Sequence, residues 1–215
     1  MKPWLILQYD DRPLSDEFKV LMKRNRKYAS KHGYEHVFLN KGYEYLPPYW
    51  RKVKAVLEYL KTDKYKGVLW LDTDAVINNM EISLHSIEDM SKSFYKTVNS
   101  AGNNIFNAGV WLVRNTKKGI KIMEDWMGKY NRDEWRQDFS GQWHTDGKWA
   151  GRAYEQGSFA YLVVPKYNQN IKTLNEKTIQ GHNIKNPEPF IYHFYNIHKE
   201  KIPEYLDILK REPRL

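Results

Sequence analysis

The chain of 215 residues contains no cysteine. The lack of thiols excludes a disulfide framework, a thiolate metal site and a cysteine nucleophile. Long hydrophobic runs are also lacking, because the first apolar run, at residues 4–9, is too short for a signal peptide and no run reaches membrane-spanning length. We therefore expect a soluble, cytoplasmic protein without a membrane span, either free-standing or one domain of a longer or viral polypeptide.

Internal repeats, low-complexity tracts and blocks of like charge are absent as well. The net charge is +9, and the lysines and arginines are scattered along the chain. This charge favours a polyanionic partner, such as a phosphorylated small molecule, while the scatter argues against nucleic acid. Aromatic side chains are plentiful instead, with 8 Trp, 16 Tyr and 8 Phe. They fill cores and also stack on sugars or bases.

Apolar runs alternate with amphipathic stretches in the first third of the chain. Buried strands are predicted at residues 4–9, 35–39 and 67–72. Helices are predicted from the N-cap Ser15 to Gly33 and at about 49–61. This order predicts an α/β fold, with three layers around a mostly parallel central sheet, and the chain length suits a single domain. Ligands of such sheets bind beyond the carboxyl ends of the strands.

The rest of the chain is patterned less regularly. Further strands are predicted at 105–114 and 190–194, and further helices at 117–130, 154–162 and 203–210. Residues 131–153 are polar and hold Trp135, Trp143 and Trp149 with little periodicity, which is typical of a functional loop or lid. These tryptophans are candidates for packing on an acceptor sugar or closing over the site, and the alternative is that they anchor the loop.

A pair of carboxylates, Asp72 and Asp74, comes directly after the apolar strand GVLWL. In an extended chain, side chains two residues apart point the same way, so both carboxylates can converge on one site. Paired carboxylate oxygens suit Mg²⁺ or Mn²⁺, which often bridge to the phosphates of a substrate. A solvated turn capped by an aspartate has the same pattern.

Four motifs follow one another along the chain: LDTDAVI at 71–77, FNAGVWLVRN at 106–115, YEQGSFAYLV at 154–163 and HFYNIHK at 193–199. In this order they resemble the GT-A fold glycosyltransferases. The RN after FNAGV and the segment at 49–52 are similar to the galactosyl/mannosyltransferase branch, and the late HF…K is similar to the glycogenin-like branch.

The resemblance implies a single GT-A domain over residues 1–215, with a Rossmann-like nucleotide-binding half at about 1–80 and an acceptor and catalytic half at about 81–215. It implies a metal-dependent hexosyltransferase. Such an enzyme moves a sugar from a nucleotide-diphosphate sugar, with a UDP-sugar favoured, to a glycan or another hydroxyl acceptor.

The resemblance also implies the metal site and its surroundings. Asp72 and Asp74 would hold Mn²⁺, or Mg²⁺, against the donor diphosphate, and His193 would be the third ligand. Lys199 falls where the family has a lysine that contacts the diphosphate. Between His193 and Lys199, however, Asn196 stands where the family has a glycine. Lys52 is a second basic candidate for the donor; the alternative for it is an ordinary solvated position on a helix.

The end of the first strand falls where the family binds the nucleobase and ribose, which makes Gln8, Tyr9, Asp10 and Arg12 candidates for binding the nucleotide. Tyr9 is suited to stack on the base and Asp10 to accept a hydrogen bond from it or from the ribose. For Arg12 the alternative is a loop salt bridge.

By the same resemblance, Asn107, Glu155 and Gln156 flank the transferred sugar and are the catalytic candidates. An inverting reaction needs a carboxylate base to deprotonate the acceptor hydroxyl. Glu155, Asp146 and Asp138 are suited to this role, whereas a retaining reaction needs no base at that position. The sequence leaves both outcomes open.

Two other functions compete with this interpretation. LDTDAVI also fits the motif of haloacid-dehalogenase-type phosphatases, with Asp72 as nucleophile and Asp74 as general acid and base. That motif normally opens its domain and requires a later acidic pair, which we do not find in residues 160–215. The charge and the aromatics also suit a basic nucleic-acid or glycan-binding module, but such a module does not need four ordered motifs.

Overall fold

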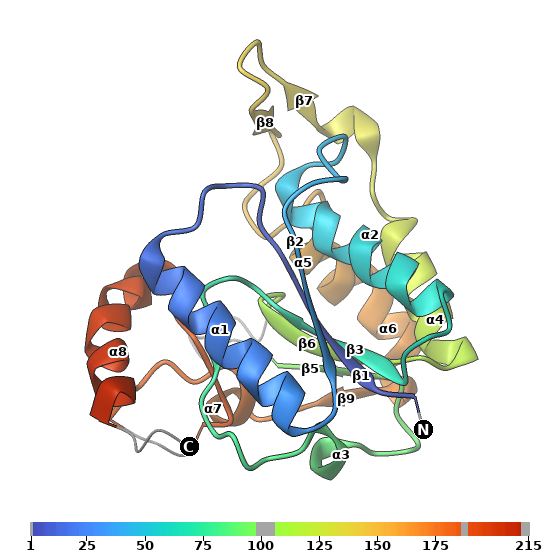
Figure 1. The fold of residues 1–215 in the computed structure, drawn as a ribbon. Helices are drawn as coiled ribbons and strands as arrows, with labels where there is room; N and C mark the ends of the chain where they lie inside the picture. The colour runs from blue at the N-terminus through green and yellow to red at the C-terminus, as the bar shows by residue number, and fades with distance from the viewer. Residues whose placement is uncertain (1, 98–105, 186–188, 212–215) are drawn as a thin grey trace.

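The computed structural model describes residues 2–97, 106–185 and 189–211, which fold around a six-stranded sheet (Figure 1). The strand order is β2-β1-β3-β6-β5-β9. The strands are β1 (Trp4–Tyr9), β2 (Glu35–Leu39), β3 (Gly67–Leu71), β5 (Phe94–Lys96), β6 (Val110–Arg114) and β9 (Ile171–Thr173). β1 pairs in parallel with β2 and β3, and β5 with β9, while β6 is antiparallel to both β3 and β5. The prediction of a mostly parallel sheet is confirmed.

Helices cover both faces of this sheet. α1 (Asp16–Lys31) lies on one face, and α2 (Pro48–Lys61) and α4 (Lys117–Met127) lie on the other (Figure 1). Side chains alternate along β1, so that Leu5 and Leu7 enter the core under α2 while Trp4 and Ile6 enter the core under α1. Three layers result, as the alternation of strands and helices predicted. Ser15 caps α1 by accepting from the backbone N–H of Phe18.

A small second sheet lies beside the first. β4 (Ala75–Ile77) leaves the main sheet after β3 and pairs antiparallel with β10 (Ile191–His193), with His193 opposite Ala75. α8 (Ile202–Arg211) packs beside α1, and short helices α3 (Leu84–Ile87) and α7 (Glu176–Ile179) complete this side. The sequence pattern predicted β10 and α8 but not β4, whose pairing brings a late segment of the chain against the Asp72–Asp74 turn.

Several predicted boundaries were wrong. The strand expected at 105–114 begins at Val110, because residues 107–109 form a turn, and Ile105 lies outside the described residues. The helix expected at 117–130 ends at Met127. The helix expected at 154–162 is three consecutive segments: α5 (Glu155–Ser158), a π-helical turn (Phe159–Val163) and α6 (Val164–Tyr167). Short 3₁₀ turns lie at Arg132–Glu134, Asn168–Asn170 and Asn196–Lys201.

The segment 131–153, expected to be a loop, contains a hairpin of β7 (Arg136–Gln137) and β8 (Trp143–His144) that projects from the body (Figure 1). Its three tryptophans differ in environment. Trp135 is buried and donates from Nε1 to the carbonyl of Ala153, so it anchors the segment to the body. Trp149 is 63% exposed, and Trp143 is half-buried.

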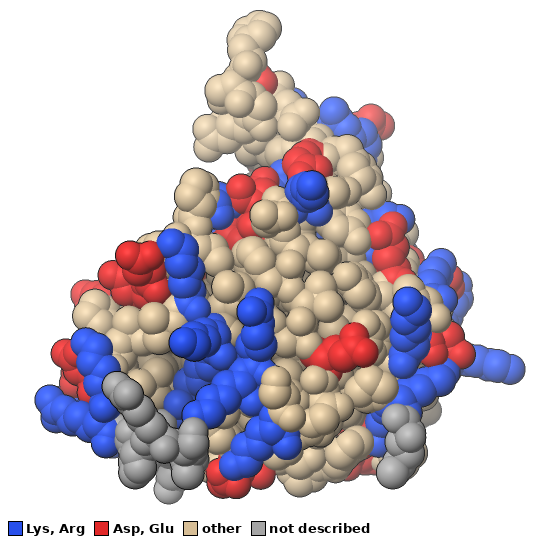
Figure 2. Space-filling view, in the orientation of Figure 1, with Lys and Arg blue, Asp and Glu red and all other residues tan. Residues whose placement is uncertain are grey.

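Basic side chains follow α1 on the face shown in Figure 2. The helix carries Lys19, Lys23, Arg24, Arg26, Lys27 and Lys31. Part of the net charge is therefore gathered on one helix, where residues 23–27 (KRNRK) hold four basic side chains, so the expectation that the basic residues are scattered along the chain was wrong for this segment. Within the described residues, no helix combines the length and the apolar character needed to cross a membrane.

Candidate active site

A cavity of about 540 Å³ opens beyond the carboxyl ends of β1 and β3. Its walls come from the end of β1, the start of α2, the turn after β3, the β7–β8 hairpin and the segment after β10. Of the predicted site residues, those that line it are Tyr9, Asp10, Arg12, Lys52, Asp72, Asp74 and Lys199. Segments from both ends of the chain therefore meet at the position expected for a ligand of an α/β sheet.

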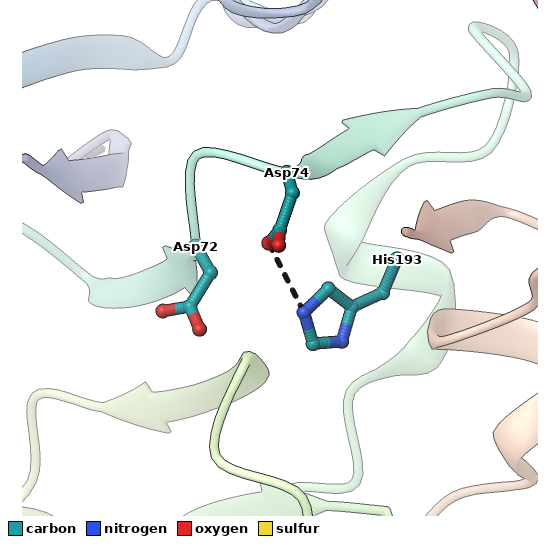
Figure 3. A group of neighbouring side chains, drawn as sticks. All are labelled: Asp72, Asp74 and His193. Carbon is teal, nitrogen blue, oxygen red and sulfur yellow. Dashed lines mark ion pairs between the residues drawn. The ribbon is translucent and has the colours of Figure 1, made fainter. Parts of the chain in front are cut away.

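Asp72 and Asp74 converge, but through a turn and not along an extended strand as predicted. β3 ends at Leu71, and the backbone N–H of Ala75 donates to the carbonyl of Asp72 at 2.9 Å. The turn redirects the chain into β4, which pairs with β10 in the other sheet. As a result the carboxylate of Asp74 points toward the His193 ring, with Asp72 beside it (Figure 3).

Asp72 is held by two donors at the same oxygen. Its Oδ1 accepts from Lys52 Nζ at 2.7 Å and from Trp70 Nε1 at 2.8 Å. The Lys52 side chain is only 11% exposed and also donates to the carbonyl of Ala108. Burial disfavours its charge, but Asp72 and Glu155 outweigh burial, so the pKa of Lys52 is raised. Lys52 is thus a buried cation facing the site, not a residue on a solvated helix face.

Asp74 lies between two basic side chains. Its Oδ1 is 3.2 Å from His193 Nε2, and its Oδ2 is 3.1 Å from Lys199 Nζ. Burial alone would raise the pKa of Asp74, but the hydrogen bonds and charges of His193 and Lys199 outweigh burial and hold it below its usual range. Asp74 is therefore an anion at neutral pH.

Lys199 reaches Asp74 from the 3₁₀ turn that begins at Asn196. Asn196 has a positive φ of 49°. Glycine is the usual residue in this left-handed region, and asparagine tolerates it better than most other side chains. The asparagine that replaces the family's glycine is thus compatible with the backbone turn that delivers Lys199.

Asp72, Asp74 and His193 fit a divalent metal ion. Each offers one ligand atom, and the three atoms lie within 4.8 Å of one another (Figure 3). Two carboxylate oxygens and an imidazole nitrogen suit Mn²⁺ and related ions. Asp74 and His193 are buried, so their orientations are fixed by the surrounding packing. The resemblance grouped these three residues, and the structure brings their side chains together, while their role as metal ligands stays a prediction.

Glu155, at the first position of α5, lies behind Lys52. It is 4% exposed, and its Oε1 is 3.7 Å from Lys52 Nζ, while Oε2 has no hydrogen-bond partner within the described part of the chain. Burial raises the pKa of Glu155 to about 7, with Lys52 opposing the rise and Asp72 adding to it. Glu155 therefore exchanges its proton near neutral pH, which is the range useful to a general acid or base.

This raised pKa makes stability depend on pH. The ordinary pKa is 4.5 and the folded pKa about 7, so the folded state keeps a proton that the unfolded state releases, and stability falls as pH rises through that window. We expect Glu155→Gln, which cannot ionise, to gain up to about 3 kcal/mol relative to the native chain between pH 5 and pH 8. Urea unfolding at the two pH values measures the gain. Glu204→Gln, at an exposed position of α8, is the control, and an equal gain in both variants would contradict the assignment.

The predicted nucleotide residues at the end of β1 form a charged cluster. Asp10, 5% exposed, accepts from Thr73 Oγ1 at 2.8 Å and from two nitrogens of Arg12. Burial opposes ionisation of Asp10, but these donors outweigh it and lower its pKa. Arg12 thus forms the loop salt bridge given above as its alternative role, and Asp10 ties the loop after β1 to the Asp72–Asp74 turn.

Other predicted residues lie behind the cavity lining. Gln8 is fully buried and donates to the carbonyl of Asp72 at 3.3 Å. Asn107 Oδ1 accepts from the N–H of Gly109, and Gln156 Oε1 accepts from the N–H of Ala108. Gln8 therefore supports the Asp72–Asp74 turn, and Asn107 and Gln156 hold the 107–109 turn.

The two other carboxylates considered as bases lie in ion pairs of the hairpin region. Asp138 pairs with His144 at 2.7 Å, and Asp146 pairs with Arg136 at 2.8 Å. Neither belongs to the cavity lining, to which the hairpin contributes Gly141, Gln142 and Trp143. Among the three candidate bases, Glu155 is the one close to the site, because it lies near Lys52, which in turn pairs with Asp72.

Sequence reasoning missed several residues of the site. Thr73 binds Asp10, Arg51 pairs with Asp11, and Gln180 contacts His193. Arg51 and Thr73 stand next to singled-out residues, so proximity in the sequence was a usable signal. Gln180 lies in an unpatterned segment, and only the fold reveals its position.

Part of the chain matches a known protein family. Residues 7–96 match the sequence model of the galactosyl transferase GMA12/MNN10 family. The matched stretch runs from β1 to β5 and includes Lys52, Asp72 and Asp74. No curated protein sequence was found to match the chain.

Three solved structures of glycosyltransferases have a similar fold. One, involved in the glycosylation of the major capsid of PBCV-1, is 16% identical with a TM-score of 0.70, over 94% of this chain and 98% of that one. GlyE of Streptococcus pneumoniae is 11% identical with a TM-score of 0.52, over 98% of this chain and 65% of its own. The catalytic domain of Drosophila β1,4-galactosyltransferase 7 is 11% identical with a TM-score of 0.51, over 94% of this chain and 79% of its own.

At such identities the structural similarity establishes the fold, and the matched sequence model supplies the class of activity. The resemblance noted in the four motifs is confirmed. The chain is a glycosyltransferase with the GT-A fold.

Proposed function

We propose that the chain transfers a hexose from a UDP-sugar to a hydroxyl group of a carbohydrate or glycoconjugate, using Mn²⁺ or Mg²⁺ held by Asp72, Asp74 and His193. The observation that carries this proposal is the set of three ligand atoms within 4.8 Å of one another beside the cavity. Nucleotide sugars carry a diphosphate, and a divalent ion at this position would meet it.

The bound ion would neutralise charge on the departing nucleoside diphosphate. Lys52 and Lys199 are placed to add to this effect, because each already contacts one metal-site carboxylate, Asp72 and Asp74 respectively. With a metal ion held by those carboxylates, the ammonium groups of Lys52 and Lys199 would be available to phosphate oxygens. Lys199, whose side chain is 45% exposed, has the greater freedom to move.

The donor and acceptor would enter from different parts of the chain. We assign the nucleotide to the half at about 1–80, where Tyr9 and Arg12 line the cavity, and the acceptor to the half at about 81–215, where the hairpin residue Trp143 lines it. The indole of Trp143 lies 4.9 Å from the guanidinium carbon of Arg132, which steadies it as a stacking surface for a sugar ring. The galactosyltransferase 7 structure holds xylobiose, a carbohydrate, which supports an acceptor of this class.

The catalytic candidates would act mainly from behind the cavity. Glu155 is the ionisable one, and it would adjust the charge that Lys52 and Asp72 present to the donor sugar. Asn107 and Gln156 would hold the 107–109 turn against the site.

Thermal unfolding with a panel of nucleotide sugars tests this function without knowledge of the acceptor. We expect a UDP-hexose to raise the melting temperature only when Mn²⁺ is present, because a ligand at about 100 times its Kd stabilises the folded state by about 2.7 kcal/mol. The same panel includes GDP-sugars and a simple phosphoester. Stabilisation that does not depend on metal would contradict the proposal. So would phosphoester hydrolysis abolished by Asp72→Asn, which would indicate a phosphatase.

A further inference from the structure

Gln180, which follows α7, is fully buried beside the metal site. Its Nε2 donates to the backbone carbonyls of Asn107 and Val110, both at 3.0 Å. A carbonyl only accepts hydrogen bonds, so these two contacts use both amide hydrogens and fix which end of the amide is nitrogen. The amide oxygen must then face the remaining neighbour, which is His193 Nδ1 at 3.0 Å.

This orientation determines which nitrogen of His193 carries a proton. Because Gln180 Oε1 is an acceptor, Nδ1 must donate and must hold its hydrogen. In a neutral imidazole the other nitrogen, Nε2, then presents its lone pair. Nε2 lies 3.2 Å from Asp74 Oδ1, where either a proton on Nε2 or a metal ion between the two atoms satisfies both of them.

The His193 ring is also confined on another side. A Cβ atom placed on Gly109 would lie 1.9 Å from Cε1 of the ring, so only glycine leaves room for it. The backbone N–H of His193 donates to the carbonyl of Gly181 at 2.8 Å. The segment 180–181 therefore holds His193 through both its backbone and its ring, and the glycine of FNAGV provides the space.

We propose that Gln180 is a positioning residue of the metal site, which keeps His193 protonated at Nδ1 and directs the bare Nε2 at the ion. The inference rests on the proposed metal-dependent function. Histidine ligands of metals generally donate their second N–H to an acceptor, and removal of such partners typically lowers metal affinity 10- to 100-fold. The partners of Gln180, two backbone carbonyls and one imidazole, leave its amide a single orientation that satisfies all three.

The variant Gln180→Met tests this role, because methionine has a similar length and flexibility but its thioether sulfur accepts a hydrogen bond from Nδ1 only weakly. We expect about 10- to 100-fold weaker Mn²⁺ binding, measured by calorimetry with UDP present. Pulsed electron paramagnetic resonance of bound Mn²⁺ should show coupling to a histidine nitrogen in the native protein and weaker coupling in the variant. A merely structural role would lower stability without changing this coupling. Gln169→Met, at an exposed position, is the matched control.

A second measurement uses the unsubstituted protein, in case Gln180→Met does not fold. Long-range ¹H–¹⁵N spectra of the histidines, assigned with a His193→Gln variant, report the proton position directly. We expect His193 to carry its proton at Nδ1, and a neutral ring protonated at Nε2 alone would overturn the inference. A folded Gln180→Met variant with native Mn²⁺ affinity and native nitrogen coupling would also overturn it. Failure of the native protein to bind Mn²⁺ with UDP would instead refute the proposed function, and the spectra would still decide the proton position.

Discussion

The variant Asp74→Asn is expected to lose Mn²⁺-dependent UDP binding by at least about 100-fold, a larger loss than removal of a partner behind a ligand typically causes. Asparagine keeps the shape of the side chain but removes the charge that faces His193 and Lys199. Without that anion, the ion loses a charged ligand and the two neighbours lose their shared partner. Calorimetry with UDP and Mn²⁺ measures the loss.

Asp207→Asn provides the control for this variant, because Asp207 is an exposed aspartate of α8 that forms an ion pair with Lys210 at the surface. We expect the control to bind UDP and Mn²⁺ as the native protein does. Equal binding by Asp74→Asn and the native protein would exclude Asp74 from the metal site. UDP binding that needs no metal in either protein would argue against the whole metal assignment.

The variant Lys52→Met is expected to lose roughly 3–5 kcal/mol of unfolding free energy, because removal of one partner leaves buried charge uncompensated. Lys52 Nζ contacts both Asp72 and Glu155, at 2.7 and 3.7 Å. Mn²⁺ with UDP should restore much of the lost stability, since the ion supplies positive charge next to Asp72. Urea unfolding with and without the metal and nucleotide measures both effects.

Lys54→Met is the matched control on the same helix. Lys54 pairs with Glu58 at the surface of α2, in an i, i+4 ion pair, and such exposed pairs contribute about 0.3–0.5 kcal/mol. A loss of the same size in both variants would mean that Lys52 acts through helix propensity. A Lys52→Met loss that Mn²⁺ and UDP leave unchanged would mean that the ion does not bind near Asp72.

The first half of the fold was predictable because its signals are local. Buried strands such as β1 and β3 are continuous apolar runs, and α1 has an N-cap at Ser15 with a Gly33 turn after it. The main error within the motif concerned geometry. Asp72 and Asp74 were expected to converge along an extended chain, whereas β4 turns away to pair with β10, a partner more than 100 residues later in the chain.

Three other short strands were not predicted, because their sequences carry too little local signal. β4, β5 and β9 have three residues each, too few to show an alternation, and their pairing depends on distant segments. The same applies to Trp135, whose burial reflects contacts with α2 and residue 153 and not its polar surroundings in the sequence.

The site residues also divide into those that the motif order identified and those that only the fold reveals. The metal group of Asp72, Asp74 and His193 followed from a resemblance in motif order, which carries information about distant contacts that composition lacks. Glu155 followed from the same source, but its raised pKa depends on burial next to Lys52, which only the fold provides. Gln180 has neither a motif nor a periodic position, so no sequence signal identified it.

The account depends most on a divalent ion at the Asp72–Asp74 turn. Crystals grown with Mn²⁺ and UDP, measured by anomalous diffraction at the manganese edge, test this directly. We expect one anomalous peak within coordination distance of a carboxylate oxygen of Asp72, a carboxylate oxygen of Asp74 and Nε2 of His193, with the UDP diphosphate against it. UDP bound in the cavity without a peak there, or a peak elsewhere on the chain, would contradict the proposed metal site.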